Sequence, residues 1–245
     1  MSHQEKAQPQ SFGIQIVSGP TVSGTIDDFE LYYARRAIRT LKKALGPKAV
    51  EKALAYEITD TERWWQNIVA LNKRNVGSDE FTPARTYLSI KGLSAEEFLD
   101  WFKNTASDRL SYLIDAHPDH YLVVPAASTQ AVIETLGGHI CKFTVHFGTP
   151  LHESVTQDMR VDFPIRMTGT GVLADGTVMG HVLHQFKNTP QGFDVDLAIY
   201  HPTSVPEELH EEHRQHLAIE FRNWVRYAYN EMKLGLPHEQ WPYVQ

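Results

Sequence analysis

The sequence predicts an α+β fold in which a curved antiparallel sheet is covered by one long terminal helix. Three observations predict it. The first third of the chain is mainly helical, the apolar period changes to two after about residue 105, and a single helical run follows Pro206. Turn signals between the strands are short, which favours hairpins and therefore antiparallel pairing. We find no internal repeat and no low-complexity segment.

The N-terminal part of the chain is expected to be helical after a short tail. Residues 1 to about 25 indicate a tail or an edge strand around "FGIQIV". Thr25 can cap "IDDFELYYARRAIRTLKKALG", which has acids in its first turn, bases in its last and Gly46 as a stop. "AVEKALAYE" and "TERWWQNIVALNK" predict two more helices, and "FTPAR" predicts a break. We therefore expect a mainly helical region over residues 1–85 and a second unit over 86–245.

The second unit is expected to hold the sheet. "TYLSIKG" predicts a strand, and Ser94 with Glu97 forms a capping box for the short helix "SAEEFLDWFKN". Three β-rich segments follow: "TQAVIETLGGHICKFTVHF", "DFPIRMTGTGVLADGTVMGHVLHQFKN" and "GFDVDLAIYHP". Their turn signals are Gly137-Gly138, Asp175-Gly176 and the stretch 189–192. Pro206 then opens a helix that is expected to run to about Lys233, where "LGLP" ends it.

Composition narrows the function classes. The 245 residues are 42% hydrophobic and can bury most of their unfolded surface in one large or two small domains. A net charge of -7 without a basic cluster argues against a nucleic-acid partner. The polar N-terminus, and the lack of any stretch near the ~20 apolar residues of a membrane span, favour a soluble cytoplasmic protein with no membrane partner. Cys141 is the only cysteine, so any metal must be held by imidazole and carboxylate.

One motif matches a nucleotide-binding pattern but lies in the wrong structural context. "GTGVLA", from Gly169 to Ala174, fits the dinucleotide pattern G-x-G-x-x-A. That loop must follow a strand and open a helix whose N-terminus meets the pyrophosphate. Here it runs into Asp175-Gly176 and a further strand, so nucleotide binding is not expected. "HEEHRQH" is also not a complete H-E-x-x-H zinc motif, because Arg214 stands at the fifth position.

The terminal helix places a histidine and a carboxylate on its apolar face. At about 100° per residue, His216 and Glu220 share a stripe with Leu217, Phe221 and Trp224. An ionised carboxylate there costs several kcal/mol unless it is paired or bound to a cation. A spacing of four residues suits both a buried hydrogen-bonded pair and a metal pair. The helix by itself leaves both alternatives open.

Two further segments place polar side chains next to apolar positions. Strict alternation in "QAVIETLGG" turns Glu134 to the same face as Val132 and Leu136. Upstream, "YLIDAHPDHYLVV" places His117 and His120 in a turn that leads into an apolar strand. One or both imidazoles, with Glu134 and the helix pair, would make a set of histidines and carboxylates suited to zinc or another first-row divalent ion.

The stretches "EEFLDWFKNTASDRLSYLIDAHPDHY", "VIETLGG" and "HLAIEF" resemble the family of diacetylphloroglucinol hydrolase and phloretin hydrolase. The resemblance covers roughly residues 93 to 235. These zinc enzymes hydrolyse the carbon-carbon bond between a phenolic ring and an acyl group. The resemblance implies a phenolic ketone as the substrate and a helix-grip sheet of the Bet v 1 type around the last helix. It also implies a homodimer in which the helical N-terminal part takes part.

The resemblance also implies a set of site residues. The metal ligands would be His120, Glu134, His216 and Glu220, holding one Zn²⁺ per chain, with His117 in reserve for the first histidine. The catalytic residues that contact the substrate would be Tyr112, His184 and Tyr200. Alternation places His184 on the apolar face of its strand. Alternation also places Tyr200 with Asp194 and Asp196, away from the apolar face.

Three functions therefore agree with the sequence. The first is metal-dependent hydrolysis of an acylated phenol to the phenol and a carboxylic acid, in which the ion polarises oxygen and activates water. The second is a helix-grip module that binds an apolar or phenolic ligand without chemistry. The third is a metal-dependent hydratase or decarboxylase acting on phenols. Nitrogen and oxygen ligands do not distinguish zinc from iron or manganese.

Overall fold

The chain forms a seven-stranded antiparallel sheet curved around one long helix. The computed structural model describes residues 16–76 and 80–236. The strand order across the sheet is β1-β7-β6-β5-β4-β3-β2. The strands are β1 (Phe81–Lys91), β2 (His120–Ala126), β3 (Thr129–Leu136), β4 (His139–Phe147), β5 (Ile165–Val172), β6 (Val178–Thr189) and β7 (Gly192–Pro202). The expected α+β class and the antiparallel pairing are confirmed.

The hairpins turn at the glycine positions that the sequence marks. Gly137 and Gly138 connect β3 to β4 with φ of 57° and 75°, a backbone region that glycine adopts at low cost. Gly137 also has no room for a side chain, because an added Cβ would lie 2.6 Å from Leu209 Cγ. This close approach brings the β3–β4 turn against the start of the last helix.

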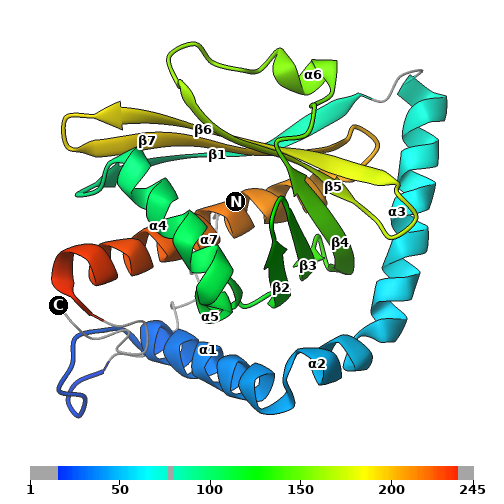
Figure 1. The fold of residues 1–245 in the computed structure, drawn as a ribbon. Helices are drawn as coiled ribbons and strands as arrows, with labels where there is room; N and C mark the ends of the chain where they lie inside the picture. Colours follow the sequence, from blue (N-terminus) through cyan, green and yellow to red (C-terminus); the bar gives the residue numbers. More distant parts are fainter. Residues whose placement is uncertain (1–15, 77–79, 237–245) are drawn as a thin grey trace, which may run out of the picture.

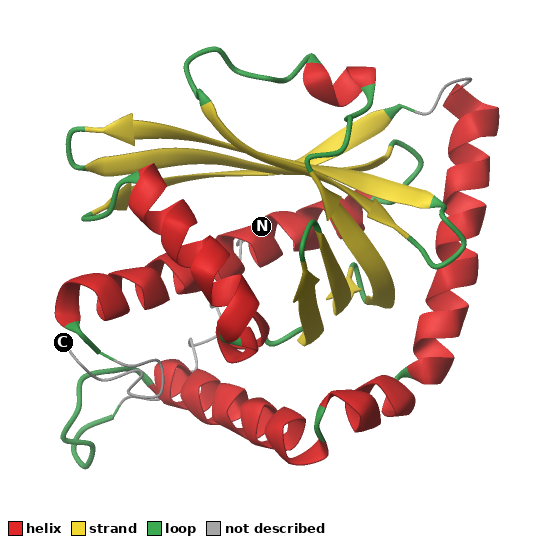
Figure 2. Cartoon of the chain, viewed as in Figure 1, coloured by secondary structure: helices red, strands yellow, loops and turns green. Residues whose placement is uncertain are grey.

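The last helix, α7 (Glu207–Leu234), lies in the hollow of the sheet (Figures 1 and 2). Pro206 precedes it and Gly235 ends it in the left-handed conformation, as the sequence predicts. Its inner face packs on the inner face of β7 through residues such as Leu217 and Phe221, which are 0% and 1% exposed. The helix-grip architecture is therefore confirmed.

Three helices precede the sheet and form an arm around it (Figure 1). They are α1 (Ile26–Leu45), α2 (Pro47–Ala53) and α3 (Ala55–Val76). Thr25 caps α1 in a complete capping box with Asp28. Trp65 and Ile68 of α3 pack on the end of the sheet nearest the β5–β6 turn. Of the tail or edge strand expected around "FGIQIV", only Ile16 and Val17 are among the described residues, and they are not in a strand.

The expected break at "FTPAR" is wrong, because these residues belong to β1. β1 pairs only with β7 and is an edge strand, and an edge tolerates Pro83 since one side of the strand needs no amide donor. The expected boundary after residue 85 therefore falls inside a strand. Residues on both sides of it belong to one continuous sheet.

The arm contacts the body of the protein with long cationic side chains. Arg35 donates a hydrogen bond to the carbonyl of Asp115, and the Lys42 ammonium donates to the carbonyls of Pro118 and His120, both at 2.6 Å. These residues belong to the turn that joins α5 (Leu110–Asp115) to β2. The arm thus fixes the turn that carries His120. Among the described residues, no helix is long and apolar enough to cross a membrane.

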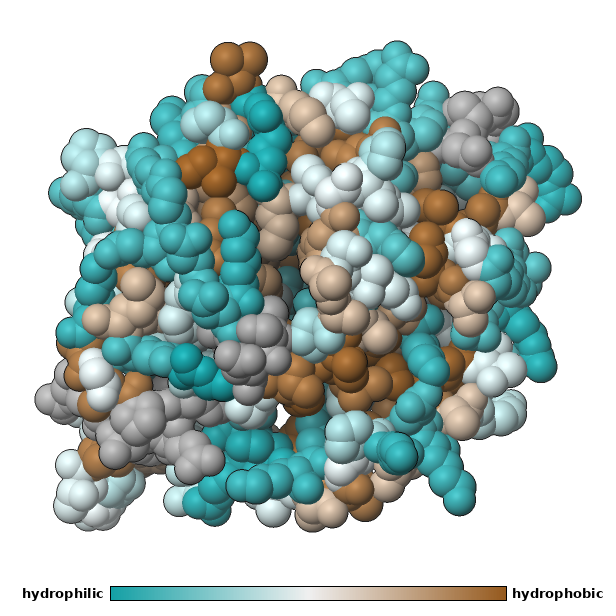
Figure 3. Space-filling view, in the orientation of Figure 1, coloured by the Kyte–Doolittle hydropathy of each residue, from teal (hydrophilic) through white to brown (hydrophobic). Residues whose placement is uncertain are grey.

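Three further helices, α4, α5 and α6, complete the described fold. α4 (Ala95–Asp108) begins at the predicted capping box, in which the Glu97 amide donates to the Ser94 hydroxyl. Together with α5 it closes one end of the hollow between the sheet and α7. α6 (Glu153–Thr156) lies on the opposite, outer face of the sheet (Figure 1). The space-filling view shows hydrophobic side chains gathered near the centre of one face of the molecule, among hydrophilic ones (Figure 3).

Candidate metal centre and cavity

Three elements bring the four predicted ligands together inside the hollow. His120 is the first residue of β2, and its backbone lies opposite Glu134 of β3 in the strand register. A bulge directly after His120 interrupts this register, a feature that redirects side chains. His216 and Glu220 face them from one turn of α7. All four residues are buried.

The distances among His120, Glu134 and His216 suit one small cation, and Glu220 lies beside this group. His120 Nε2 lies 2.9 Å from His216 Nε2, 3.5 Å from Glu134 Oε2 and 3.4 Å from Glu220 Oε2. His216 Nε2 lies 4.0 Å from Glu134 Oε2 and 3.8 Å from Glu220 Oε2. Tetrahedral zinc, with bonds of about 2.0–2.2 Å, places its ligand atoms roughly 3.3–3.6 Å apart. Within the described chain, His120, Glu134 and His216 form the one group of at least three such residues whose ligand atoms lie within 4.8 Å.

The hydrogen bonds of the two turn histidines decide between them. His120 Nδ1 lies 2.7 Å from the carbonyl of Leu113, and because a carbonyl only accepts, Nδ1 carries a hydrogen. The neutral ring then offers the lone pair of Nε2 to the centre. His117 Nδ1 instead accepts from the Asp119 amide at 3.2 Å, and its ring stacks on that of His216 at 3.9 Å. The structure therefore favours His120 as the ligand, with Leu113 orienting its ring.

Glu134 and Glu220 are buried acids, and burial determines their protonation. Burial raises the pKa of Glu134 to about 7 and also raises the pKa of Glu220. Burial alone would lower the pKa of His120, but its bond to Glu220 and the charge of Glu134 raise it. Among the described residues, no lysine or arginine forms an ion pair with either glutamate. A proton shared with His120 compensates the two carboxylates only in part, and a divalent ion would do so fully.

An apolar cavity of about 120 Å³ adjoins the centre. It lies between α7 and the inner face of the sheet, and Glu134, His216 and Glu220 form part of its wall. Much of the remaining wall is apolar, with Phe143, Val145, Phe147, Met167, Ile199 and Trp224 among its residues. A cavity of ~150 Å³ can hold a benzene molecule, so this one has room for about one aromatic ring.

His184 lies on the cavity wall, where alternation along β6 predicts it. Its Nδ1 accepts the backbone amide hydrogen of Ala198 at 3.2 Å, so in the neutral ring Nε2 carries the hydrogen. Burial lowers the pKa of His184 to about 3, so the ring is neutral at physiological pH. His184 can therefore donate a hydrogen bond from Nε2 but does not hold an extra proton.

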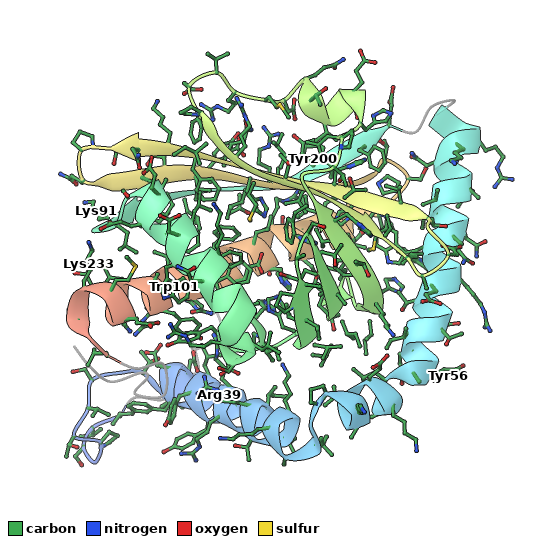
Figure 4. All side chains as sticks on the ribbon, in the orientation of Figure 1. Arg39, Tyr56, Lys91, Trp101, Tyr200 and Lys233 are labelled. Carbon is green, nitrogen blue, oxygen red and sulfur yellow. The ribbon has the colours of Figure 1, made fainter. Side chains whose placement is uncertain are left out.

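The two predicted tyrosines do not line the cavity. The Tyr112 hydroxyl donates to Glu231 at 3.2 Å, and its ring packs edge-on against Trp101, in the cluster that closes the end of the hollow. Tyr200 lies on the outer face of the sheet, where strand alternation places it (Figure 4). Its hydroxyl donates to Asp158 at 2.7 Å. Neither tyrosine is a wall residue of this cavity, and their expected contact with a substrate stays a prediction.

Sequence reasoning missed three histidines of the cavity wall, of which His181 lies on β6. His213 lies one turn before His216 on α7, and His201 lies on β7. Their ring nitrogens, His201 Nε2 and His213 Nδ1, are 3.4 Å apart. His213 falls in the apolar stripe of the terminal helix, and His201 continues the alternation of Phe193, Val195 and Leu197. Both signals are present in the sequence, although neither indicates a role.

Comparisons with known proteins add little to this geometry. No protein-family model matches the chain, and a search of curated proteins finds no match. The solved structure of Ara h 8.0201 aligns with a TM-score of 0.42 at 10% identity, over 62% of this chain and 99% of that chain. A likeness this distant carries no argument about function. The helix-grip assignment rests on the strand order and packing described above.

Proposed function

We propose that this protein is a metal-dependent hydrolase that cleaves the carbon-carbon bond between a phenolic ring and an acyl group. One observation carries the proposal: two buried carboxylates and two imidazoles converge beside an apolar cavity, and no lysine or arginine of residues 16–76 and 80–236 forms an ion pair with either carboxylate. Such a set fits Zn²⁺, and it also accepts iron or manganese. The resemblance in "DAHPDHY", "VIETLGG" and "HLAIEF" supports the substrate class.

The cavity supports an aromatic substrate of modest size. Its volume of about 120 Å³ and its apolar wall suit one ring, with the acyl group directed to the centre. His184 can donate Nε2–H to a phenolic oxygen, since its Nδ1 is held by the Ala198 amide. A neutral donor in an apolar wall favours a substrate that carries a matching acceptor, because a mismatched one leaves the donor unpaired.

The reaction balances as one water added across the bond between ring and carbonyl. The ring carbon takes a proton and the acyl carbon takes hydroxide, which gives the phenol and a carboxylic acid. A bound divalent ion supplies Lewis acidity, which polarises oxygen and makes water a better nucleophile. His184 positions the ring. The neutral pair His213 and His201 can pass a proton, because an imidazole can gain one at one nitrogen and release one at the other.

Metal content and product release test the proposal. Purified protein should contain about one divalent ion per chain, and phenolic ketones should release carboxylic acid. His216→Ala and Glu220→Gln should remove both the ion and the activity. His146→Ala is the matched control, since His146 alternates with the cavity residues Val145 and Phe147 and therefore faces away from the cavity. Full activity in metal-free protein would contradict the proposal.

The cavity itself supports a second candidate, a binding module without chemistry. Burial lowers the pKa of His181 to about 4, and of His184 and His201 to about 3, so these wall histidines are neutral and can serve simply as hydrogen-bond donors. Metal-loaded protein that binds a phenol but releases no acid from any phenolic ketone would favour this candidate. Release of carbon dioxide, or addition of water to a double bond, would favour a decarboxylase or hydratase.

A further inference from the structure

A second pocket lies on the other side of the metal centre. It has a volume of about 340 Å³ and opens between the turn before β2, the β3–β4 turn and the first half of α7. We call it the polar pocket; its wall comprises His117, Asp119, Thr135, Leu136, Gly137, Glu212, His213, Gln215, His216 and Ile219. His213 and His216 also line the apolar cavity. These two rings therefore separate the polar pocket from the cavity.

The charge of the polar pocket is negative. Asp119 and Glu212 lie in its wall, and neither lysine nor arginine is among its wall residues. Lys42 of α1 lies outside this wall; its ammonium donates to the carbonyls of Pro118 and His120, and its charge also acts on Asp119, which leaves Glu212 as the wall carboxylate without a cation of the turn beside it. Asp119 directly precedes the ligand His120 in the chain. The acidic wall thus leads inward to a ligand of the centre.

A hydrated divalent cation is far more compatible with this pocket than with the apolar cavity. Moving an ion through an apolar passage strips its water without replacing it, which costs many kcal/mol. Acidic groups at a pocket opening raise the local concentration of cations and their rate of association. The His216 ring forms part of the inner wall of the polar pocket, while its Nε2 lies 2.9 Å from His120 Nε2 at the centre.

We propose that the polar pocket is the route by which a divalent cation reaches the metal centre, with Asp119 and Glu212 capturing the ion and His216 receiving it. The inference rests on the metal centre of the proposed function. The ion and the substrate then occupy different pockets. The cation arrives through the polar pocket, and the apolar substrate occupies the cavity on the other side of His213 and His216. Substrate in the cavity then leaves the route of the ion open.

Zinc-loading kinetics test this route without any measurement of activity. Chelator-stripped protein is mixed with Zn²⁺, and the loss of free zinc is followed with an indicator dye in a stopped-flow instrument. Asp119→Asn combined with Glu212→Gln should slow association about 10-fold at low ionic strength and weaken its dependence on salt. Glu208→Gln, which removes one exposed negative charge from the same helix outside the pocket wall, should leave the rate within about twofold.

A variant that blocks the pocket gives an independent measurement. Gln215 is exposed in the pocket wall, and Gln215→Trp should slow both zinc uptake and zinc release into excess EDTA, with the final zinc content unchanged at about one per chain. Val182→Phe, which narrows the apolar cavity, should leave both rates unchanged.

The outcomes separate this inference from the proposed function. If all variants load zinc at the wild-type rate, or if only Val182→Phe slows loading, the route is wrong while the metal centre stands. If wild-type protein takes up no divalent ion, the metal centre is wrong and the route falls with it. Slow loading in Gln215→Trp and in the double acidic variant, with full final content, supports the route.

Discussion

At the scale of single residues, the hydrogen bond on the far side of each imidazole assigns its role. The Leu113 carbonyl holds His120 with Nε2 free to bind an ion, whereas the Asp119 amide holds His117 in the other orientation. We therefore expect His120→Ala to weaken zinc binding by more than the roughly 10- to 100-fold typical of an outer-shell partner. His117→Phe, which preserves the stack on His216, should keep about one zinc per chain. Elemental analysis and chelator competition measure both, and the reverse pattern would make His117 the ligand.

The buried acids give the metal centre a definite pH dependence. Burial raises the pKa of Glu134 to about 7 from an ordinary value of 4.5. Without metal, the folded protein holds a proton that the unfolded chain releases, so this group's stabilisation is complete below about pH 4.5 and is lost as pH rises through 7. Zinc replaces that proton. The increase in Tm caused by zinc should therefore grow between pH 6 and pH 8, as measured by thermal unfolding with and without the ion, and an increase that shrinks with pH would contradict this assignment.

At the scale of elements, Tyr200 ties the segment that carries α6 to the outer face of the sheet. Its hydroxyl donates to Asp158 and accepts from Arg85 at 2.6 Å, and Arg85 in turn pairs with Asp158. Tyr200→Phe should lower the free energy of unfolding by about 1–2 kcal/mol and leave zinc content and activity unchanged. Denaturant unfolding measures the first and elemental analysis the second. A large loss of activity with unchanged stability would return Tyr200 to the catalytic set.

The sequence predicts those elements whose signals are local. Pro206, Gly235 and the apolar stripe mark α7, and the alternation around Glu134 and His184 orients two strands, because caps and periods depend only on neighbours along the chain. Tyr112 could not be placed in this way, since its position depends on how α4 and α5 pack against α7. The expected strand "TYLSIKG" begins earlier than predicted, at Phe81, because its first residues contain Pro83. A proline excludes a central strand but not an edge strand, and the edge is set by the whole sheet.

At the scale of the whole molecule, the candidate metal centre depends on parts that are far apart in the chain. His120 is held by Lys42 of the arm and faces β3 and α7, so the ligands come together only after the sheet has closed around the helix. Lys42→Met should keep the apolar stem of the side chain but lose both bonds to the turn. We expect weaker zinc binding, measured by chelator competition. The free energy of unfolding should fall by about 1–3 kcal/mol. Equal zinc affinity in the variant and the wild type would show that the turn holds its geometry without the arm.

Helix α1 also presents an exposed apolar stripe on the surface of the molecule. None of its residues is buried, and Leu31, Ile38, Leu41 and Leu45 are 52%, 40%, 59% and 55% exposed. Their spacings of seven, three and four residues put them on one stripe of the kind that pairs helices in coiled coils. Arg35 and Lys42, which contact the turn beside this stripe, would fix its direction relative to the body.

We expect the protein to form a homodimer through this stripe. Leu41→Glu should shift it to a monomer in sedimentation velocity experiments at micromolar concentration, because a buried unpaired charge costs several kcal/mol at an interface. Lys43→Glu lies on the opposite side of the helix and is the matched control, which should remain dimeric. Zinc content should stay near one per chain in both variants, since the four ligands all belong to the body of one chain. A wild-type monomer at these concentrations, or a dimer that survives Leu41→Glu, would place the contact elsewhere.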